Sequence, residues 1–207
     1  MTDPLAVLQR IRETSPRTLP VPGEACELCT EPIAQDHGHM VDLEARSLMC
    51  VCRGCYLLFI SDGAGGAHFR SVPDRYLALR DLLLTPGQWD SLQIPVSVAF
   101  FFLNSSIGRV AAFYPGPAGA TESELPLETW QQVTEGNQDL ATLQSEVEAL
   151  LVRAQPNRAG VECYIVPIDA CYELVGRLRR LWRGFDGGQE ANAMLHAFFD
   201  DVKARSA

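Results

Sequence analysis

Two pairs of cysteines near the N-terminus constrain the folding of this 207-residue chain more than any other feature. Cys26 and Cys29 form one C-x-x-C pair, and Cys52 and Cys55 form the second. A C-x-x-C turn places both sulfurs on one side of a tight knuckle, where they chelate one edge of a tetrahedron. The 22 residues between the pairs suffice for a hairpin that brings the second knuckle beside the first. We therefore predict that these four cysteines bind one metal ion.

The ligand chemistry favours zinc (Zn²⁺) in a zinc-ribbon-like module. Zinc suits a closed tetrahedral shell of thiolates, and its binding free energy contributes to the folding of a segment too small to bury a core of its own. A closed shell leaves no position for water, so we expect a structural ion. The alternative is a rubredoxin-like iron site for electron transfer. Rubredoxin knuckles carry Gly directly after the second cysteine, where this chain has Thr30 and Tyr56.

Three further residues are candidates for the metal shell. Cys50 lies two positions before Cys52, on the same face of a strand, so it is either a buried small residue beside the metal or a replacement for Cys52. For His37 and His39 we expect a hydrogen bond to a thiolate or plain surface exposure. His39 is the reserve ligand, because its phase in the strand is the better one.

Composition and charge indicate in which compartment the protein works and which partners it can bind. No run approaches the roughly 18 uncharged apolar residues of a membrane helix, and no apolar segment follows the N-terminal charges, so we expect a cytoplasmic protein with reduced thiols. The net charge is −9, and residues 110–152 contain acids but neither Lys nor Arg, which argues against nucleic-acid binding. The basic cluster near the end of a predicted helix should face solvent, with a partner-docking face as the alternative; it comprises Arg177, Arg179, Arg180 and Arg183.

The pattern of hydrophobic and turn residues divides the chain into three parts. Residues 1–23 form a lead-in segment with a short amphipathic helix over 1–12. Residues 24–62 form the zinc-ribbon-like module, with a hairpin of strands 39–43 and 47–51. The glycine-rich stretch 62–66 marks its exit, and residues 67–207 form an α+β domain.

In this larger domain we expect a small, mainly antiparallel sheet covered by helices, so the fold class is α+β. Strands are predicted over 96–103, 109–114 and 161–168, with Pro115 to Gly119 ending the second. Helices are predicted from Thr85-Pro86 through Trp89, over 126–135 and 138–153, from a cap at Asp169, and over 189–204. The Asp169 helix should point Tyr172, Val175, Leu178, Leu181 and Trp182 inward, and the last should bury Ala191, Met194, Leu195, Phe198 and Val202.

The sequence offers no catalytic constellation. Cys163 and Cys171 are expected to be buried thiols. The glycines of 62–66 lack the Lys-Ser/Thr of a phosphate-binding loop, while His68 and His196 are isolated. Without a nucleophile paired to a base, we predict no catalytic residue and no enzyme activity.

Several sequence segments, taken together, resemble those of a known protein family. They are Cys26-Glu-Leu-Cys29, Ile94-Pro-Val, Ala99-Phe-Phe-Phe102, Ala112-Phe-Tyr-Pro115, Gly119-Ala-Thr-Glu-Ser123, Val147-Glu-Ala-Leu-Leu-Val152, Val166-Pro-Ile-Asp-Ala-Cys-Tyr-Glu-Leu-Val-Gly176 and Trp182-Arg-Gly-Phe-Asp-Gly-Gly188. From about residue 24 onward the chain resembles an uncharacterised bacterial family encoded beside nickel-iron hydrogenase genes. The resemblance implies a cytoplasmic accessory protein that acts through a protein partner, a hydrogenase subunit or maturation factor. It supplies no activity and no catalytic residue.

Overall fold

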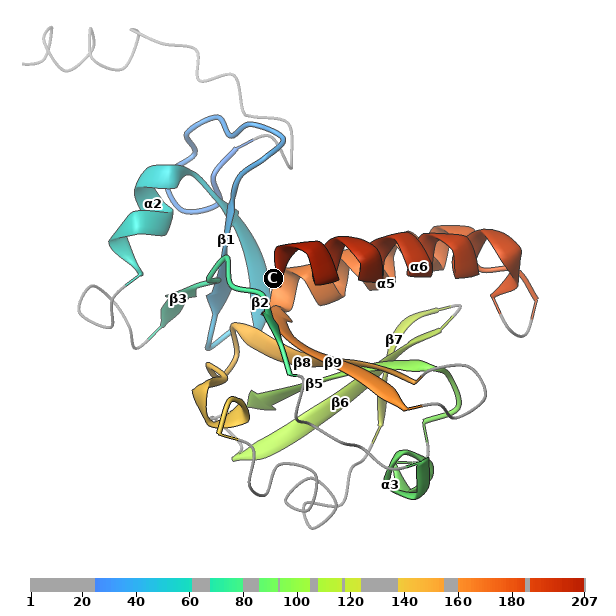
Figure 1. The fold of residues 1–207 in the computed structure, drawn as a ribbon. Helices are drawn as coiled ribbons and strands as arrows, with labels where there is room; N and C mark the ends of the chain where they lie inside the picture. Colours follow the sequence, from blue (N-terminus) through green and yellow to red (C-terminus); the bar gives the residue numbers. More distant parts are fainter. Residues whose placement is uncertain are drawn as a thin grey trace, which may run out of the picture.

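The structure is a computed structural model that describes residues 25–60, 68–79, 86–92, 94–104, 108–116, 118–123, 138–154, 160–184 and 187–206. Within these ranges it is an α+β protein with two antiparallel sheets (Figure 1). The expected lead-in 1–23 with its helix, the glycine-rich stretch 62–66 and the expected helix 126–135 lie outside the described residues.

The smaller sheet contains the predicted N-terminal hairpin. Strands β1 (Gly38–Asp42) and β2 (Ser47–Val51) pair antiparallel, and β3 (Phe69–Ser71) joins the other edge of β1. The hairpin turn is fixed by the Asp42 carboxylate, which accepts hydrogen bonds from the backbone N–H groups of Glu44 and Ala45 at 2.9 and 2.8 Å. The short helix α2 (Arg53–Leu58) follows β2. We call residues 25–60 together with β3 the cysteine module, and the larger sheet with its helices the larger domain. The small sheet thus takes one strand, β3, from the range predicted to belong to the 67–207 domain.

The larger sheet has six antiparallel strands in the order β4-β9-β8-β5-β6-β7. Their bounds are β4 Leu77–Ala78, β5 Val98–Asn104, β6 Arg109–Gly116, β7 Gly119–Ser123, β8 Glu148–Ala154 and β9 Val161–Pro167. The predicted pairing of β5 with β6 is confirmed, as is the strand β9. The segment from Pro115 to Gly119 does not end the hairpin, because β6 continues through Gly116 and turns directly into the edge strand β7.

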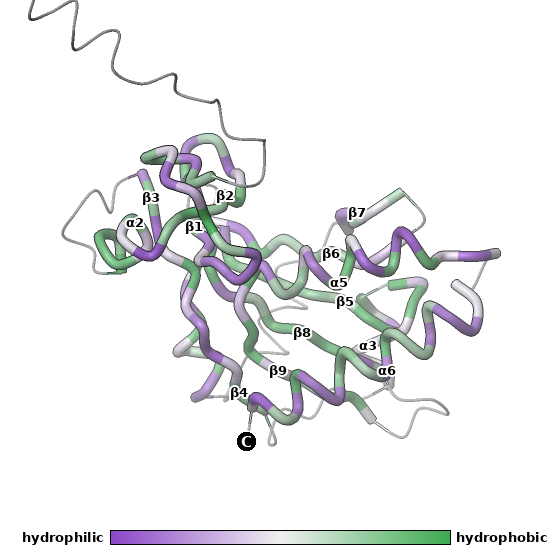
Figure 2. Tube along the Cα trace, turned by 90° about the horizontal axis from the view of Figure 1, so that it is seen from above, coloured by the Kyte–Doolittle hydropathy of each residue, from purple (hydrophilic) through white to green (hydrophobic). Residues whose placement is uncertain are grey.

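Helices cover both faces of this sheet. The long helices α5 (Ile168–Leu181) and α6 (Gly188–Arg205) lie on one face, and α3 (Pro86–Ser91) lies on the other with a 3-10 turn at Leu140–Thr142 (Figure 1). Apolar residues therefore fill two layers, one on each face of the sheet. Figure 2 shows the hydrophobic stretches of β5, β8 and β9 in green. The expectations for α3 and for both C-terminal helices are confirmed.

The helix expected over 138–153 was wrong, because its second half is the central strand β8. Val147, Ala149 and Leu151 face the layer under α5 and α6, whereas Leu150 and Val152 face the opposite layer. A strand buried on both faces is apolar at nearly every position, so its pattern also fits one side of a helix.

Two details of α5 also differ from expectation. Tyr172 is 45% exposed rather than core-facing, while Val175 and Leu178 are buried. The N-cap position is Pro167, and Asp169 lies in the first turn instead. One Asp169 oxygen accepts the backbone N–H of Ala170, which leaves the other oxygen free to bond outside the helix.

The cysteine module packs on the larger domain through one face of its hairpin. Val41 and Leu48 contact the apolar layer under α5 and α6. At the far end of α6, the Arg205 guanidinium forms an ion pair with Asp74 at 2.7 Å and lies 3.8 Å from the centre of the Tyr76 ring. None of the helices in the described ranges is long and apolar enough to cross a membrane.

Candidate metal centre

The four cysteines of the two C-x-x-C pairs converge in the fold. The sulfur atoms of Cys26, Cys29, Cys52 and Cys55 all lie within 4.8 Å of one another, and the Cys29 and Cys52 sulfurs are 3.6 Å apart. In a tetrahedral zinc site with Zn–S bonds of about 2.3 Å, two sulfurs are separated by about 3.8 Å. The cluster therefore has the dimensions of a four-thiolate metal site.

Backbone hydrogen bonds shape the first knuckle. The Thr30 N–H donates to the Cys26 carbonyl at 2.8 Å, and the Cys26 N–H donates to the Glu31 carbonyl at 2.7 Å. Thr30 closes this turn with a φ of +64°, a conformation that costs a β-branched residue energy. The chain thus holds a strained turn where it positions two sulfurs.

The second knuckle is the start of a helix. Cys52 is the N-cap of α2, and its sulfur accepts the Cys55 N–H at 3.4 Å. This single helical turn points both sulfurs toward the first knuckle, with Cys55 buried and Cys52 half-buried. Cys26 and Cys55 also pack beside the fully buried Met40 and Val51, so the cluster is part of the module's small apolar core.

The protonation of the cluster favours a bound cation. Burial opposes ionisation of Cys26, but hydrogen bonds from the backbone of Cys52, Cys29 and Leu28 lower the pKa of its thiol to about 6. Burial and contact with the other thiols raise the pKa of Cys55. One cysteine of the cluster therefore ionises readily, whereas a second thiolate beside it is disfavoured by charge repulsion. A divalent cation would offset this repulsion between thiolates.

The opposite face of the same hairpin carries a second group of ligand-type side chains. His37, His39 and Cys50 offer one ligand atom each within 4.8 Å of one another. The reserve candidates of the sequence, Cys50 and His39, thus lie together but apart from the four-cysteine group. Sequence reasoning did not predict this second group. The signal was present in the pairing of His39 opposite Cys50 that the predicted hairpin implies.

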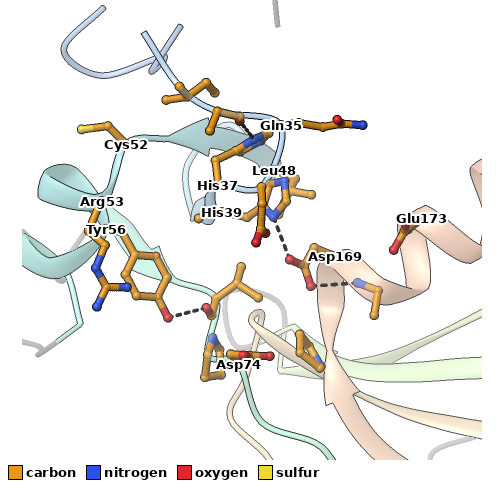
Figure 3. A pocket seen from close by; sticks show the side chains of 18 of the residues that line it. Gln35, His37, His39, Leu48, Cys52, Arg53, Tyr56, Asp74, Asp169 and Glu173 are labelled. Carbon is orange, nitrogen blue, oxygen red and sulfur yellow. Dashed lines mark hydrogen bonds and ion pairs between the residues drawn. The ribbon is translucent and has the colours of Figure 1, made fainter. Parts of the chain in front are cut away.

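Two members of this group, His37 and His39, line a cleft of about 900 Å³ between the cysteine module and the larger domain (Figure 3). His37, His39 and Tyr56 contribute from the module, and Asp169 and Glu173 contribute from α5. The His39 Nδ1 atom lies 2.7 Å from the Asp169 carboxylate, as the dashed line in Figure 3 marks. The two parts of the molecule therefore share one polar contact at the wall of the cleft.

The remaining sequence candidates lie elsewhere. Cys163 and Cys171 are buried as expected, and burial raises the pKa of Cys163 to about 12. His68 is exposed beside Glu44, whereas His196 accepts a hydrogen bond from Arg153 at 2.8 Å. The basic cluster of α5 faces solvent, as expected for Arg177, Arg179, Arg180 and Arg183.

Comparison with known families places the whole described fold in one group. The family of unknown function DUF5947 matches residues 25–206, which include both sheets, the four cysteines and the cleft. The chain belongs to this family. No curated protein and no solved structure matches the chain. The family match begins directly before the first knuckle, so the cysteine module is part of the family's shared sequence and not an appendage to it.

Proposed function

We propose that the protein is a zinc-binding accessory or assembly protein that acts by protein–protein interaction, with a zinc-ribbon-like module held in shape by Cys26, Cys29, Cys52 and Cys55. The observation that carries this proposal is the convergence of four sulfurs within 4.8 Å from two knuckles. Four thiolates complete the tetrahedral shell of zinc, so this ion stabilises the fold and takes no part in hydrolysis.

An exposed apolar patch supports an interaction role. Leu57, Leu58 and Ile60 are 50, 61 and 59% exposed, and they lie on or directly after α2. Cys55, one turn earlier in the same helix, belongs to the sulfur cluster. Zinc bound there would fix the orientation of the patch, and clustered apolar side chains on a surface are typical of a protein-binding site.

The resemblance described above suggests the partner, a subunit or maturation factor of a nickel-iron hydrogenase in the cytoplasm. Two segments add candidate contact surfaces. The first, Ala118 to Ser123, contains strand β7, which is an edge of the larger sheet within the described residues, and an edge strand can pair with a partner strand. The second is the connection between α5 and α6, from Gly184 to Gly188.

Iron in a rubredoxin-like electron-transfer role is the second candidate. Its specific support is the exposure of Cys29 and the half-exposure of Cys52, which would give a redox partner access to the metal. Two features count against it, because Thr30 occupies the left-handed turn position where Gly is expected, and Tyr56 lies inside a helix. Zinc is therefore the preferred ion.

Affinity capture from native cells tests the interaction. We expect the wild-type protein to recover a hydrogenase subunit or maturation factor, and Leu58→Glu to lose it by placing a charge in the apolar patch. Ala197→Glu is the matched control, because it adds the same charge at an exposed position of α6. Equal recovery by both variants, with unchanged zinc content, would contradict the role of the patch.

Deletion of the gene tests the proposed context. We expect lower hydrogenase activity at unchanged hydrogenase transcript levels, with activity restored by the wild-type chain but not by Leu58→Glu. Normal hydrogenase activity in the deletion strain would contradict the hydrogenase association. A visible spectrum with reversible reduction in the purified protein would instead favour the iron alternative.

A further inference from the structure

We propose that His37, His39 and Cys50 bind a second metal ion, separate from the four-cysteine site, and that this ion keeps an open coordination position toward the cleft between the cysteine module and the larger domain. The proposal goes beyond the function argued above, because that function needs only the four cysteines.

The backbone brings these three side chains to one face of the hairpin. His39 lies directly opposite Cys50 in the register of β1 and β2, so their side chains project from the same face of the sheet. His37 lies two residues before His39, and the centres of the two imidazole rings are 4.9 Å apart. One ligand atom from each of the three side chains lies within 4.8 Å of the other two, close enough for small side-chain rotations to bring all three onto a single ion.

Hydrogen bonds leave the same nitrogen free on both histidines. The Nδ1 atom of His37 lies 2.9 Å from the Ala34 carbonyl, which can only accept, so Nδ1 carries the proton. His39 donates its Nδ1 proton to the Asp169 carboxylate at 2.7 Å. Each neutral ring then holds its lone pair on Nε2. The Nε2 atom of His37 is buried and has no hydrogen-bond partner among the described residues, although a buried polar atom without one costs free energy. A metal ion would supply the missing partner.

The supporting contacts are those of a built metal site. A histidine ligand usually donates its second N–H group to a carboxylate or carbonyl oxygen, which fixes the ring and strengthens the ligand. Asp169 and the Ala34 carbonyl fill these two positions. Cys50 is also held in place, because its N–H donates to the Glu27 carboxylate and its carbonyl accepts the Glu27 N–H.

The two sites lie on different sides of the hairpin. Met40 and Val51 project from the other face, where they are fully buried beside Cys26 and Cys55. His39, by contrast, faces Asp169 on α5 and lines the cleft. The second ion would therefore contact both the cysteine module and, through Asp169, the larger domain.

The ligand set defines the chemistry of this second site. Two imidazoles and one thiolate suit zinc, and three protein ligands with one open position are the arrangement of catalytic rather than structural zinc. The cleft gives this position access to solvent and room for a ligand. We infer that it takes water or a small anion.

Metal counting on the full chain tests the second site. After equilibration with Zn²⁺ and removal of free ions, we expect two zinc ions per wild-type chain and one per chain in His37→Ala, His39→Ala and Cys50→Ser. His68→Ala should retain two, because His68 is an exposed histidine outside both groups. One ion in the wild type, or two in His39→Ala, would overturn the proposal.

A second variant tests the site while leaving its three proposed ligands in place. Asp169→Asn should weaken Zn²⁺ binding at the second site about 10- to 100-fold, measured by competition with a chelator, while the first ion binds with unchanged affinity. In the protein loaded with two Co²⁺ ions, azide should change the visible spectrum, and it should not do so in Cys50→Ser with one. Unchanged affinity in Asp169→Asn would overturn the role of Asp169, and an azide-insensitive wild-type spectrum would overturn the open position.

Discussion

At the scale of single residues, the cysteine module depends on close packing around its candidate metal sites. Gly38 lies between His37 and His39, and the Tyr56 ring of α2 packs directly on it. A Cβ atom at position 38 would lie 2.7 Å from that ring, closer than real contacts allow. The Tyr56 hydroxyl donates to the Val72 carbonyl at 2.9 Å, so the ring cannot move away freely. This glycine therefore sets how closely α2 approaches β1.

Substitution of Gly38 tests this packing. We expect Gly38→Ala to lower the free energy of unfolding by about 1–3 kcal/mol, because the added methyl group overpacks the site. Gly176→Ala is the matched control, since a Cβ atom there meets no neighbour, and it should raise helix stability by about 0.5–1 kcal/mol. Chemical denaturation measures both, and a Gly38→Ala protein as stable as the wild type would contradict the contact.

An ion pair between the half-buried Arg75 and the fully buried Glu148 joins the segment after β3 to the centre of the large sheet. Glu148 is fully buried at the start of β8, and both its carboxylate oxygens accept hydrogen bonds from Arg75 at 2.6 Å. Arg75→Ala should destabilise the protein by about 3–5 kcal/mol, because it leaves a buried charge without its partner. Arg177→Ala removes an exposed ion pair with Glu173 and should cost less than about 1 kcal/mol. Equal losses in the two variants would contradict this role of the Arg75–Glu148 pair.

Thiol reactivity separates the cysteines by environment. The thiolate is the reactive form, so a raised pKa protects a cysteine from alkylation at neutral pH. Burial raises the pKa of Cys171 and brings that of Cys163 to about 12, so both should stay unmodified in the folded protein at pH 7. After metal removal the four cysteines of the cluster lose both the metal and the folded module that protects them, so they should be alkylated before Cys163 and Cys171. Mass spectrometry of alkylated peptides checks this order, and early modification of Cys171 would contradict it.

At the scale of elements, the sequence predicted the strands and helices whose hydrophobic pattern fits only one type of secondary structure. The hairpins of β1 with β2 and of β5 with β6 alternate or carry clear turn residues, and α6 has a single apolar face. β8 was missed, because strands on both sides and apolar layers above and below remove the alternation that marks a strand. Tyr172 was wrongly predicted to be buried for a related reason. Helical spacing identifies the apolar face of α5 but not how far the neighbouring elements cover that face.

The two faces of β8 give a direct test. Leu150 and Leu151 are both fully buried, in opposite layers of the larger domain. Each replacement by Ala should therefore cost about 2–5 kcal/mol. The helix predicted over 138–153 would also bury both leucines on its apolar face, but it would expose Val152, which is fully buried in β8. Val152→Ala therefore separates the two folds, because it should be destabilising only in the strand. Denaturation of the three variants decides, with Thr121→Ala on the exposed part of β7 as a control that should change little.

At the scale of the whole molecule, the two candidate sites differ in how far local sequence patterns determine them. The four-cysteine group could be predicted, because knuckle spacing alone brings its ligands together. The group of His37, His39 and Cys50 could not be predicted in full, because Asp169 lies 130 residues after His39 in the chain. Only the packing of the cysteine module against α5 places this carboxylate within hydrogen-bond distance of the His39 imidazole.

Metal removal should therefore affect the two parts of the molecule differently. The larger domain has two extensive apolar layers, whereas the core of the cysteine module is small and includes Cys26 and Cys55. A strong chelator should abolish protection from hydrogen exchange in β1 and β2 but leave it in β8 and β9, because a metal ion held by the four cysteines would contribute its folding free energy to the cysteine module. Uniform loss of protection, or none, would contradict this division.

The metal content of purified Cys50→Ser protein tests the central claim most directly, because this variant keeps the four-cysteine cluster and lacks one ligand of the second group. We predict one zinc ion per chain by elemental analysis and no absorption in the visible range. A folded protein that contains no zinc, or that contains iron with a strong visible spectrum, would contradict the claim that Cys26, Cys29, Cys52 and Cys55 form a structural zinc site.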